Sequence, residues 1–272
     1  MKFVDLGQLD GPVLLFGGPY SNLAATSALF AEASKRHIPA DQIICTGDTV
    51  AYCADAAATV SEIRKTKCVV IAGNCEKQLA DGALDCGCGF GTGTTCDLLS
   101  KGWYAHANAQ IGVDARAWMG DLPDIVCFTH HSKRYAVIHG GVTDISRFLW
   151  STSGEAGFLE EISLLRNLVG PMDAVVAGHS GIGFSRHIHG VEWTNAGVIG
   201  MPPNNGSSET QFVVLANGQA ELHELTYNFK ATVENMQSCG LTQGYHASLE
   251  TGYWPSEDVL PSDLRVSSCA SG

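Results

Sequence analysis

The sequence predicts an α/β protein in which two mixed sheets pack face to face, with helices on their outer sides. In the first half, apolar β-type runs alternate with helix-like segments, which is the pattern of a parallel sheet with helical crossovers. The later part is richer in β-type runs, and Asn217-Gly218 between two of them is a strong hairpin signal. Parallel strands early and antiparallel strands late favour a four-layer sandwich.

The first three strands and the helices between them can be placed by their apolar runs. Strands are expected at Pro12–Phe16, Gln42–Thr46 and Cys68–Ala72, and helices at Leu23–His37 and Ala54–Lys65. The first helix ends before a proline, which cannot continue it.

The alternation then breaks. Ala80–Thr95 has too many glycines and too little periodicity for a helix or a strand, so we expect an inserted loop. A helix at Asp114–Gly120 leads to two strands, LPDIVCF and RYAVIHGG, and a further helix is expected at Gly154–Leu168. The later strands are expected at Asp173–Ala177, Gly183–His189, Val191–Thr194, Thr210–Ala216 and Gln219–Tyr227. The tail from about residue 230 is expected to be helical and then extended.

Composition limits the function classes. The 272 residues can bury a sizeable core, and 45% are hydrophobic while 16% are charged. The net charge of −12 argues against nucleic acid and against anionic membrane surfaces, because both attract basic faces. The N-terminus lacks a signal-peptide pattern and no stretch approaches membrane-spanning length, so we expect a cytoplasmic protein.

Ten cysteines are many for such a chain. Cys45, Cys68 and Cys127 lie in apolar runs and are expected to be small buried hydrophobic residues. A glycine-rich loop, DCGCGFGTGTTC, holds Cys86, Cys88 and Cys96 close together. Three interpretations of this loop compete: a structural zinc or iron site, a redox-active group over an active centre, or thiols without a role.

Four apolar strands end directly in a polar residue with a glycine beside it. The stretches IICTGD, VVIAGN, YAVIHGG and VVAGHSG deliver Asp48, Asn74, His139 and His179. If the strands are neighbours, their carboxyl ends point the same way and the four side chains can converge. Two oxygens and two imidazole nitrogens suit a divalent transition metal such as Mn, Fe or Zn.

These motifs resemble the calcineurin-like metallophosphoesterases, especially their compact bacterial branch. The family pattern runs Asp-X-His, Gly-Asp, Gly-Asn-His, a lone His and Gly-His-X-His. The matching pieces are TGD at 46–48, GNCE at 73–76, HGG at 139–141 and GHSG at 178–181, and TNAGVIGMPPN at 194–204 is similar to the closing loop. The resemblance covers about residues 13–227 and implies a metallophosphoesterase-type β-sandwich.

The chain departs from the pattern at several places. Gly18 and Tyr20 stand where the family has the Asp and His of its first motif, while Asn22 keeps the position of the family's Asn. Cys75 stands in place of the His beside the substrate phosphate, and Gly181 replaces the last His.

The losses fall on one side of the site. By the resemblance, one of the two metal ions keeps only Asp48, whereas the other keeps the ligand quartet of Asp48, Asn74, His139 and His179. The hypothesis is therefore a single-metal centre or a rebuilt second site. Tyr20 could ligate a ferric ion as phenolate or only pack. Cys75 could be a ligand, a reactive thiolate or a space-filling residue. His187 and His189 are spare ligands or a polar strand face.

Together these inferences predict a phosphoric ester hydrolase that acts on a small phosphorylated metabolite, with one divalent Mn, Fe or Zn ion per chain. Catalytic roles are assigned to Asp48, Asn74, Cys75 and His139, and substrate contacts to Asn22 and Cys75. The alternatives are an inactive metal- or ligand-binding relative and a redox or iron enzyme that uses the cysteine-rich loop. No nucleic-acid or membrane partner is expected, and a homo-oligomer is left open.

The expected organisation is a metallophosphoesterase domain over residues 1–228 with an inserted Cys/Gly-rich loop at 80–97. A helical and extended C-terminal extension is expected over residues 229–272.

Overall fold

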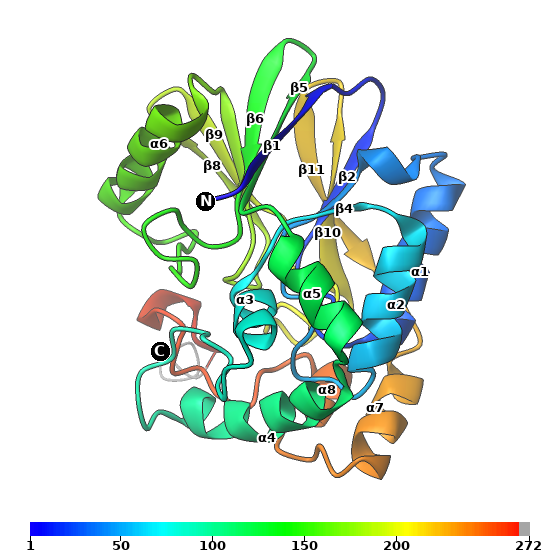
Figure 1. The fold of residues 1–272 in the computed structure, drawn as a ribbon. Helices are drawn as coiled ribbons and strands as arrows, with labels where there is room; N and C mark the ends of the chain where they lie inside the picture. Colours follow the sequence, from blue (N-terminus) through cyan, green and yellow to red (C-terminus); the bar gives the residue numbers. More distant parts are fainter. Residues whose placement is uncertain (267–272) are drawn as a thin grey trace.

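Two sheets pack face to face in the computed structural model, which describes residues 1–266 (Figure 1). The six-stranded sheet has the order β1 (Phe3–Gln8), β5 (Ile125–His130), β6 (Lys133–Val137), β7 (Ala174–Ala177), β9 (Val191–Asn195), β8 (Phe184–Ile188). The five-stranded sheet has the order β11 (Gln219–Leu225), β10 (Thr210–Ala216), β2 (Val13–Phe16), β3 (Ile43–Cys45), β4 (Val69–Val70).

Both sheets are mixed. β2, β3 and β4 are parallel, while β10 runs antiparallel to both β2 and β11. In the six-stranded sheet β6, β7 and β9 are parallel, and β5 and β8 pair antiparallel with β6 and β9. The predicted fold class, an α/β sandwich of two mixed sheets flanked by helices, is confirmed.

Alternate side chains of β2 point to opposite faces of the sheet, and their contacts show how the layers pack. Val13 and Leu15 face the other sheet and pack with residues such as Val126 and Val137, whereas Leu14 and Phe16 face the helices. A strand whose two faces are both covered needs apolar residues at every position, which explains why VLLF has no alternation.

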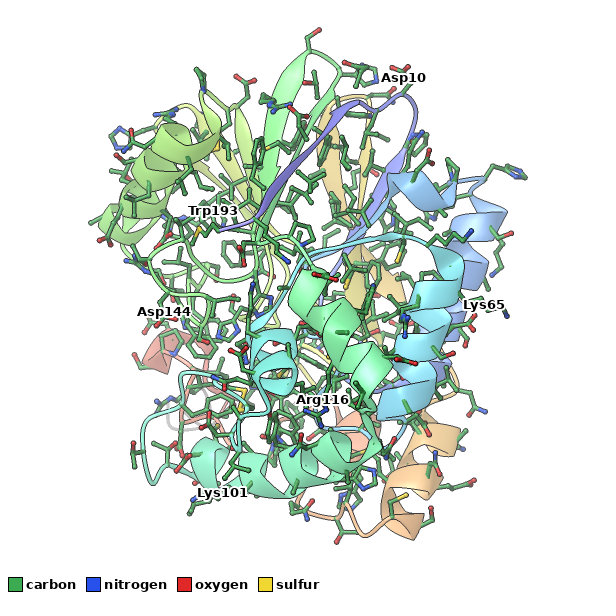
Figure 2. The ribbon with its side chains drawn as sticks, viewed as in Figure 1. Asp10, Lys65, Lys101, Arg116, Asp144 and Trp193 are labelled. Carbon is green, nitrogen blue, oxygen red and sulfur yellow. A yellow bond between two sulfur atoms is a disulfide. The ribbon has the colours of Figure 1, made fainter. Side chains whose placement is uncertain are left out.

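Helices cover both outer faces. α1 (Leu23–Lys35) and α2 (Ala56–Thr66) lie on the five-stranded sheet, and α6 (Glu155–Val169) lies on the six-stranded sheet (Figure 1). Trp193 of β9 is fully buried beneath α6, where its ring meets that of Phe158 edge-on (Figure 2). Cys45 and Cys127 are buried in these layers as predicted, but Cys68 is only partly buried.

The remaining helices gather beyond one end of the strands (Figure 1). They are α3 (Asn74–Asp81), α4 (Thr95–Gln110), α5 (Val113–Asp121), α7 (Phe229–Ser238) and α8 (Tyr245–Thr251), and short 3-10 turns lie at Ala40–Gln42 and Ser262–Leu264. Arg116 of α5 ties three of them together, because its guanidinium donates to the carbonyls of Leu79, Asn108 and Ile111 at 2.6–3.0 Å (Figure 2).

Three elements differ from the prediction. β1 is an additional strand, and it escaped notice because FVDLGQ is exposed at the sheet edge and carries little apolar signal. The residues after Gly73 begin helix α3 and do not form a simple turn. The loop that we expected at Ala80–Thr95 spans 82–94, and α4 follows it. Thr94 caps α4 by accepting the Asp97 N–H. This capping signal was in the sequence, but Gly102 within the helix weakened the helical pattern that follows it.

The boundary after residue 228 stays a prediction, and residues 267–272 of the expected extension lie outside the described part. α7 is attached to the main body by two hydrogen bonds. Thr232 donates to the Asn22 side chain at 3.0 Å, and Asn235 donates to Asp55 at 2.5 Å. Within residues 1–266, no helix combines the length and the hydropathy that a membrane span requires.

Candidate metal centre

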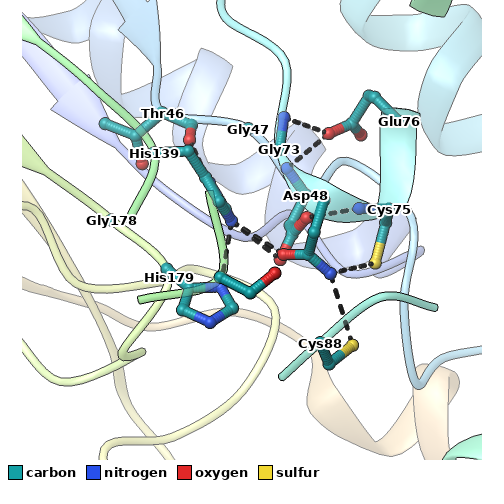
Figure 3. A network of polar contacts seen from close by, with 12 residues as sticks. Thr46, Gly47, Asp48, Gly73, Cys75, Glu76, Cys88, His139, Gly178 and His179 are labelled. Atoms are coloured by element: carbon teal, nitrogen blue, oxygen red, sulfur yellow. Dashed lines mark hydrogen bonds and ion pairs between the residues drawn. The ribbon is translucent and has the colours of Figure 1, made fainter. Parts of the chain in front are cut away.

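Four loops that follow strands bring the ligand quartet together (Figure 3). Asp48 follows β3, Asn74 opens α3 after β4, and His139 and His179 follow β6 and β7. All four side chains are buried. The carboxyl ends of parallel strands meet at one edge, and this places the residues side by side although they span almost half of the chain.

His139 Nε2 is the centre of the quartet. It lies 3.0 Å from Asn74 Oδ1, 3.1 Å from His179 Nδ1 and 3.3 Å from Asp48 Oδ2. Asp48, His139 and His179 each offer a ligand atom within 4.8 Å of the others, which is the spacing of a potential metal site.

The outer atoms of these side chains are held by the backbone. His139 Nδ1 lies 2.6 Å from the Thr46 carbonyl, to which it donates its proton. Asn74 Nδ2 donates to the Cys86 carbonyl at 2.8 Å. Asp48 Oδ1 accepts the Cys75 N–H at 3.1 Å (Figure 3). Each contact turns the other polar atom of the side chain toward the shared point, as second-shell contacts do in metal sites.

The donor set fits a divalent cation. When His139 carries a proton on Nδ1 alone, as it would with a cation bound, its Nε2 lone pair faces a carboxylate oxygen, an amide oxygen and another ring nitrogen. A single proton among these atoms would satisfy only some of them, whereas one cation can accept electron pairs from all four. The residues present therefore match the group that the family resemblance implies.

Burial and the neighbouring side chains together set the charges of the residues in the quartet. Burial, and then the neighbouring His139, lower the pKa of His179 to about 3, so its ring is neutral and can offer a lone pair. The pKa of Asp48 is lowered as well: burial opposes this, but His139 and then His179 outweigh it. Asp48 is therefore an anion.

Glu76 is a buried residue of this site to which we had assigned no role. Its carboxylate accepts the backbone N–H groups of Asp48, Thr49 and Gly73 at 2.7–2.8 Å and the Thr49 hydroxyl at 2.7 Å. It therefore clamps the Asp48 loop to the start of α3. The spacing of Gly73 and Glu76, as in a capping box, was the available signal.

Gly47 makes this clamp possible. Its φ is +97°, and a Cβ there would lie 2.6 Å from the Gly73 nitrogen, so only glycine allows the two loops to approach so closely.

Aromatic rings lie beside two positions at which the family's motif residues are missing, Gly18 and Gly181. A Cβ on Gly18 would lie 2.6 Å from the ring of Tyr20, and a Cβ on Gly181 would meet the Trp254 ring at 3.5 Å. Tyr20 packs edge-on against Tyr52, and burial, followed by the charge of Asp48, raises the pKa of Tyr20 well above its usual range. Tyr20 is therefore a neutral packing residue in this structure, and the phenolate interpretation is not supported.

Asn22 is not brought to the quartet, so the structure corrects its predicted substrate contact. Its amide caps α1 by accepting the Ala25 N–H at 3.1 Å and donates to the Gly200 carbonyl and the Tyr227 hydroxyl. It also accepts from Thr232. A fully buried amide with all of these partners joins α1 to α7 and has no atom left for a substrate.

Cys75 also differs from its predicted catalytic and substrate-binding role. Its side chain is 1% exposed and packs in an apolar cluster with Leu79 and Trp103. Burial, and then the charge of Asp48, raise the pKa of the thiol, which disfavours a reactive thiolate. Cys75 contacts the quartet in two ways: its backbone N–H donates to Asp48, and its sulfur accepts from the Asn74 amide at 3.5 Å.

The other cysteines and histidines lie apart from the quartet or have other partners. Cys86 and Cys88 are paired as a disulfide, while Cys96 is a free thiol at the start of α4, so within the described residues these three form no metal cluster. His187 and His189 are exposed, and His189 pairs with Glu155 at 3.3 Å. They are a polar surface and do not belong to the site.

A pocket opens beside Asp48 and His179. It has about 580 Å³ of empty space, part of it open to solvent. We call it the aromatic pocket, and its rings are those of Tyr20, Tyr52, Phe90, Phe148, Trp150, Tyr245 and Trp254.

Comparison with known proteins supports the fold. No protein-family model matches the chain, and no curated protein matches it. Solved structures do match over most of its length. A metallophosphoesterase from Sphaerobacter thermophilus is 16% identical, with 90% of this chain and 100% of that chain covered and a TM-score of 0.66. A hypothetical protein from Pyrococcus horikoshii OT3 is 12% identical, with 90% and 98% covered and a TM-score of 0.71.

At these identities the likeness is one of fold. The chain has the calcineurin-like metallophosphoesterase fold, as the motifs predicted. The roles of its residues have to be argued from the site itself.

Proposed function

Starting from this fold and the ligand quartet, we propose that the chain is a metal-dependent phosphoesterase that hydrolyses a small phosphorylated metabolite with one divalent ion. The observation that carries the proposal is the convergence of Asp48 Oδ2, Asn74 Oδ1 and His179 Nδ1 on His139 Nε2. Imidazole nitrogens combined with carboxylate and amide oxygens suit Mn, Fe or Zn.

A divalent ion in the quartet would polarise a phosphoryl oxygen and lower the pKa of a water molecule. The residues of the chain hold the geometry. The Thr46 carbonyl fixes the tautomer of His139, Glu76 fixes the Asp48 loop, and the Cys86 carbonyl fixes the Asn74 amide. The aromatic pocket beside the quartet excludes water from part of the site, which strengthens electrostatic interactions there.

Elemental analysis and a phosphatase assay test the proposal together. We expect about one ion per chain and Mn²⁺-dependent turnover of an aryl phosphate that Asp48→Ala abolishes. His179→Ala and Asn74→Ala should lower metal occupancy sharply while the circular dichroism spectrum is unchanged. His187→Ala, which removes an exposed histidine, is the matched control and should keep the ion. Unchanged metal content in both quartet variants would refute the assignment.

One observation favours a second candidate function, an inactive relative that only binds a metal or a ligand. Gly18, Tyr20 and Gly181 stand where the resemblance implies ligands of the other ion, so the chain lacks half of the two-ion machinery that the resemblance implies. One ion per chain without turnover of any phosphoester would support that candidate. Thiolate-to-iron absorption bands would instead support the redox alternative. A cytoplasmic location and a homo-oligomer stay predictions.

A further inference from the structure

The aromatic pocket is built from the positions at which this chain departs from the family pattern. The ring of Tyr20 lies against Gly18, and the ring of Trp254 lies against Gly181. Trp254 comes from the segment after α8 and is anchored at both ends, because its indole N–H donates to the Pro202 carbonyl and its backbone N–H donates to Asn204 Oδ1, each at 2.7 Å. The C-terminal segment is thus a wall of the site.

Three rings of the pocket lie nearly parallel to one another, and one of them, Phe148, also packs against the His179 ring with centroids 4.3 Å apart. Phe148 and Trp150 are stacked 2° from parallel with centroids 5.5 Å apart, and Phe90 continues the stack at 6.4 Å and 18°. Phe90, Phe148 and Trp254 are partly exposed, so they border the opening of the pocket. Offset stacking on such faces stabilises a flat aromatic group beyond the burial of its area.

The charged groups around the pocket limit the charge of the phosphate ester that can bind there. Among the described residues that line it, none is a lysine or an arginine. The Asp48 carboxylate, with Glu76 behind it, would already offset much of the charge of a divalent ion. A doubly charged monoester would therefore leave more uncompensated negative charge beside apolar rings than a singly charged phosphodiester, which is unfavourable.

We propose that the aromatic pocket binds an aromatic ester group of a singly charged phosphodiester, with Trp254 as a specificity-determining residue. This inference rests on the proposed phosphoesterase function, which it narrows to a substrate class. Trp254 contacts the organic group and not the phosphorus, so its removal should affect aromatic diesters selectively.

Two nitrophenyl diesters provide matched probes. Bis(4-nitrophenyl) phosphate and methyl 4-nitrophenyl phosphate share their charge and leaving group and differ in the remaining ester group. With Mn²⁺ present, Trp254→Ala should lower kcat/KM for the bis-aryl ester by roughly tenfold, mainly through KM, and for the methyl ester by less than about threefold. Trp254→Phe keeps a ring and should retain most of the preference. Tyr253→Ala, an exposed neighbour outside the pocket, is the control.

Binding is measured separately by calorimetry on the Mn²⁺-loaded protein with diphenyl phosphate and dimethyl phosphate. Diphenyl phosphate should bind at least about tenfold more tightly, and Trp254→Ala should remove most of this difference. Circular dichroism verifies that Trp254→Ala is folded; if it is not, Trp254→Leu, which fills the space without a ring, takes its place and should likewise remove most of the difference.

The outcomes separate the two proposals. Tight binding of diphenyl phosphate that depends on Trp254, without turnover of any ester, would support the pocket and refute the hydrolase. Turnover with equal sensitivity of both nitrophenyl diesters to Trp254→Ala, or faster turnover of 4-nitrophenyl phosphate than of either diester, would overturn the pocket inference and leave the hydrolase standing. If the protein showed no binding of diphenyl phosphate and no turnover of any ester, both proposals would be overturned.

Discussion

Replacing Glu76 by glutamine should weaken both the fold and the metal centre, although the side chain keeps its shape. In the native chain, one carboxylate oxygen accepts the N–H and the hydroxyl of Thr49, and the other accepts the N–H groups of Asp48 and Gly73. A glutamine amide has only one oxygen, so two of these four donors would face an NH₂ group.

The magnitude follows from counting these contacts. The better orientation places the NH₂ group beside Thr49, whose hydroxyl can rotate to accept while its N–H is left unpaired at about 1–3 kcal/mol. The two remaining bonds lose their charge assistance, at roughly 0.5–1 kcal/mol each. Loss of a buried charge offsets part of this, because burial, and then Asp48, raise the pKa of Glu76 and so disfavour its charged form. We expect a net loss of roughly 2–4 kcal/mol in the free energy of unfolding.

Urea denaturation of the metal-free protein measures this loss, and a metal titration measures the effect on the site. Affinity should fall about 10- to 100-fold, because Glu76 orients the Asp48 loop without being a ligand. Glu62→Gln, a surface change in α2, is the control and should stay within about 0.5 kcal/mol of the native protein. Native stability together with native metal affinity in Glu76→Gln would refute the clamp.

Three further perturbations test other parts of the molecule. Gly181→His should not add a second ion, because Gly18 and Tyr20 still leave that side of the site without its other ligands; elemental analysis that finds two ions would contradict this. Arg147→Ala leaves the buried Glu161 carboxylate without its guanidinium at 2.6 Å and should cost about 2–3 kcal/mol in urea denaturation, against little for the exposed Arg166→Ala. Burial lowers the pKa of His130 below 6.5, so the folded state binds this proton more weakly than the unfolded state. The free energy of unfolding should therefore fall as the pH drops below about 6.5, and less so in His130→Gln; equal slopes would rule out this residue.

The sequence located strands correctly where an apolar run in the chain is also buried in the fold. The strands before Asp48 and His179 are apolar and buried on both faces because helices or the other sheet cover them, so their ends could be located to within a residue; the strand before His139 ends four residues earlier than expected. The convergence of the quartet then followed from strand direction alone. β1 and α4 escaped because an exposed edge strand and a helix interrupted by Gly102 carry weak periodicity.

What the sequence determined by itself was the α/β sandwich, the ligand quartet and the loss of the other ion's ligands at Gly18, Tyr20 and Gly181. Tertiary structure decided what replaced those ligands. Trp254 lies 73 positions after Gly181, and no local pattern relates them, because their contact depends on how the segment after α8 returns to the sheet ends. The same holds for Glu76, whose four partners come from two loops that only the packed sheet brings together.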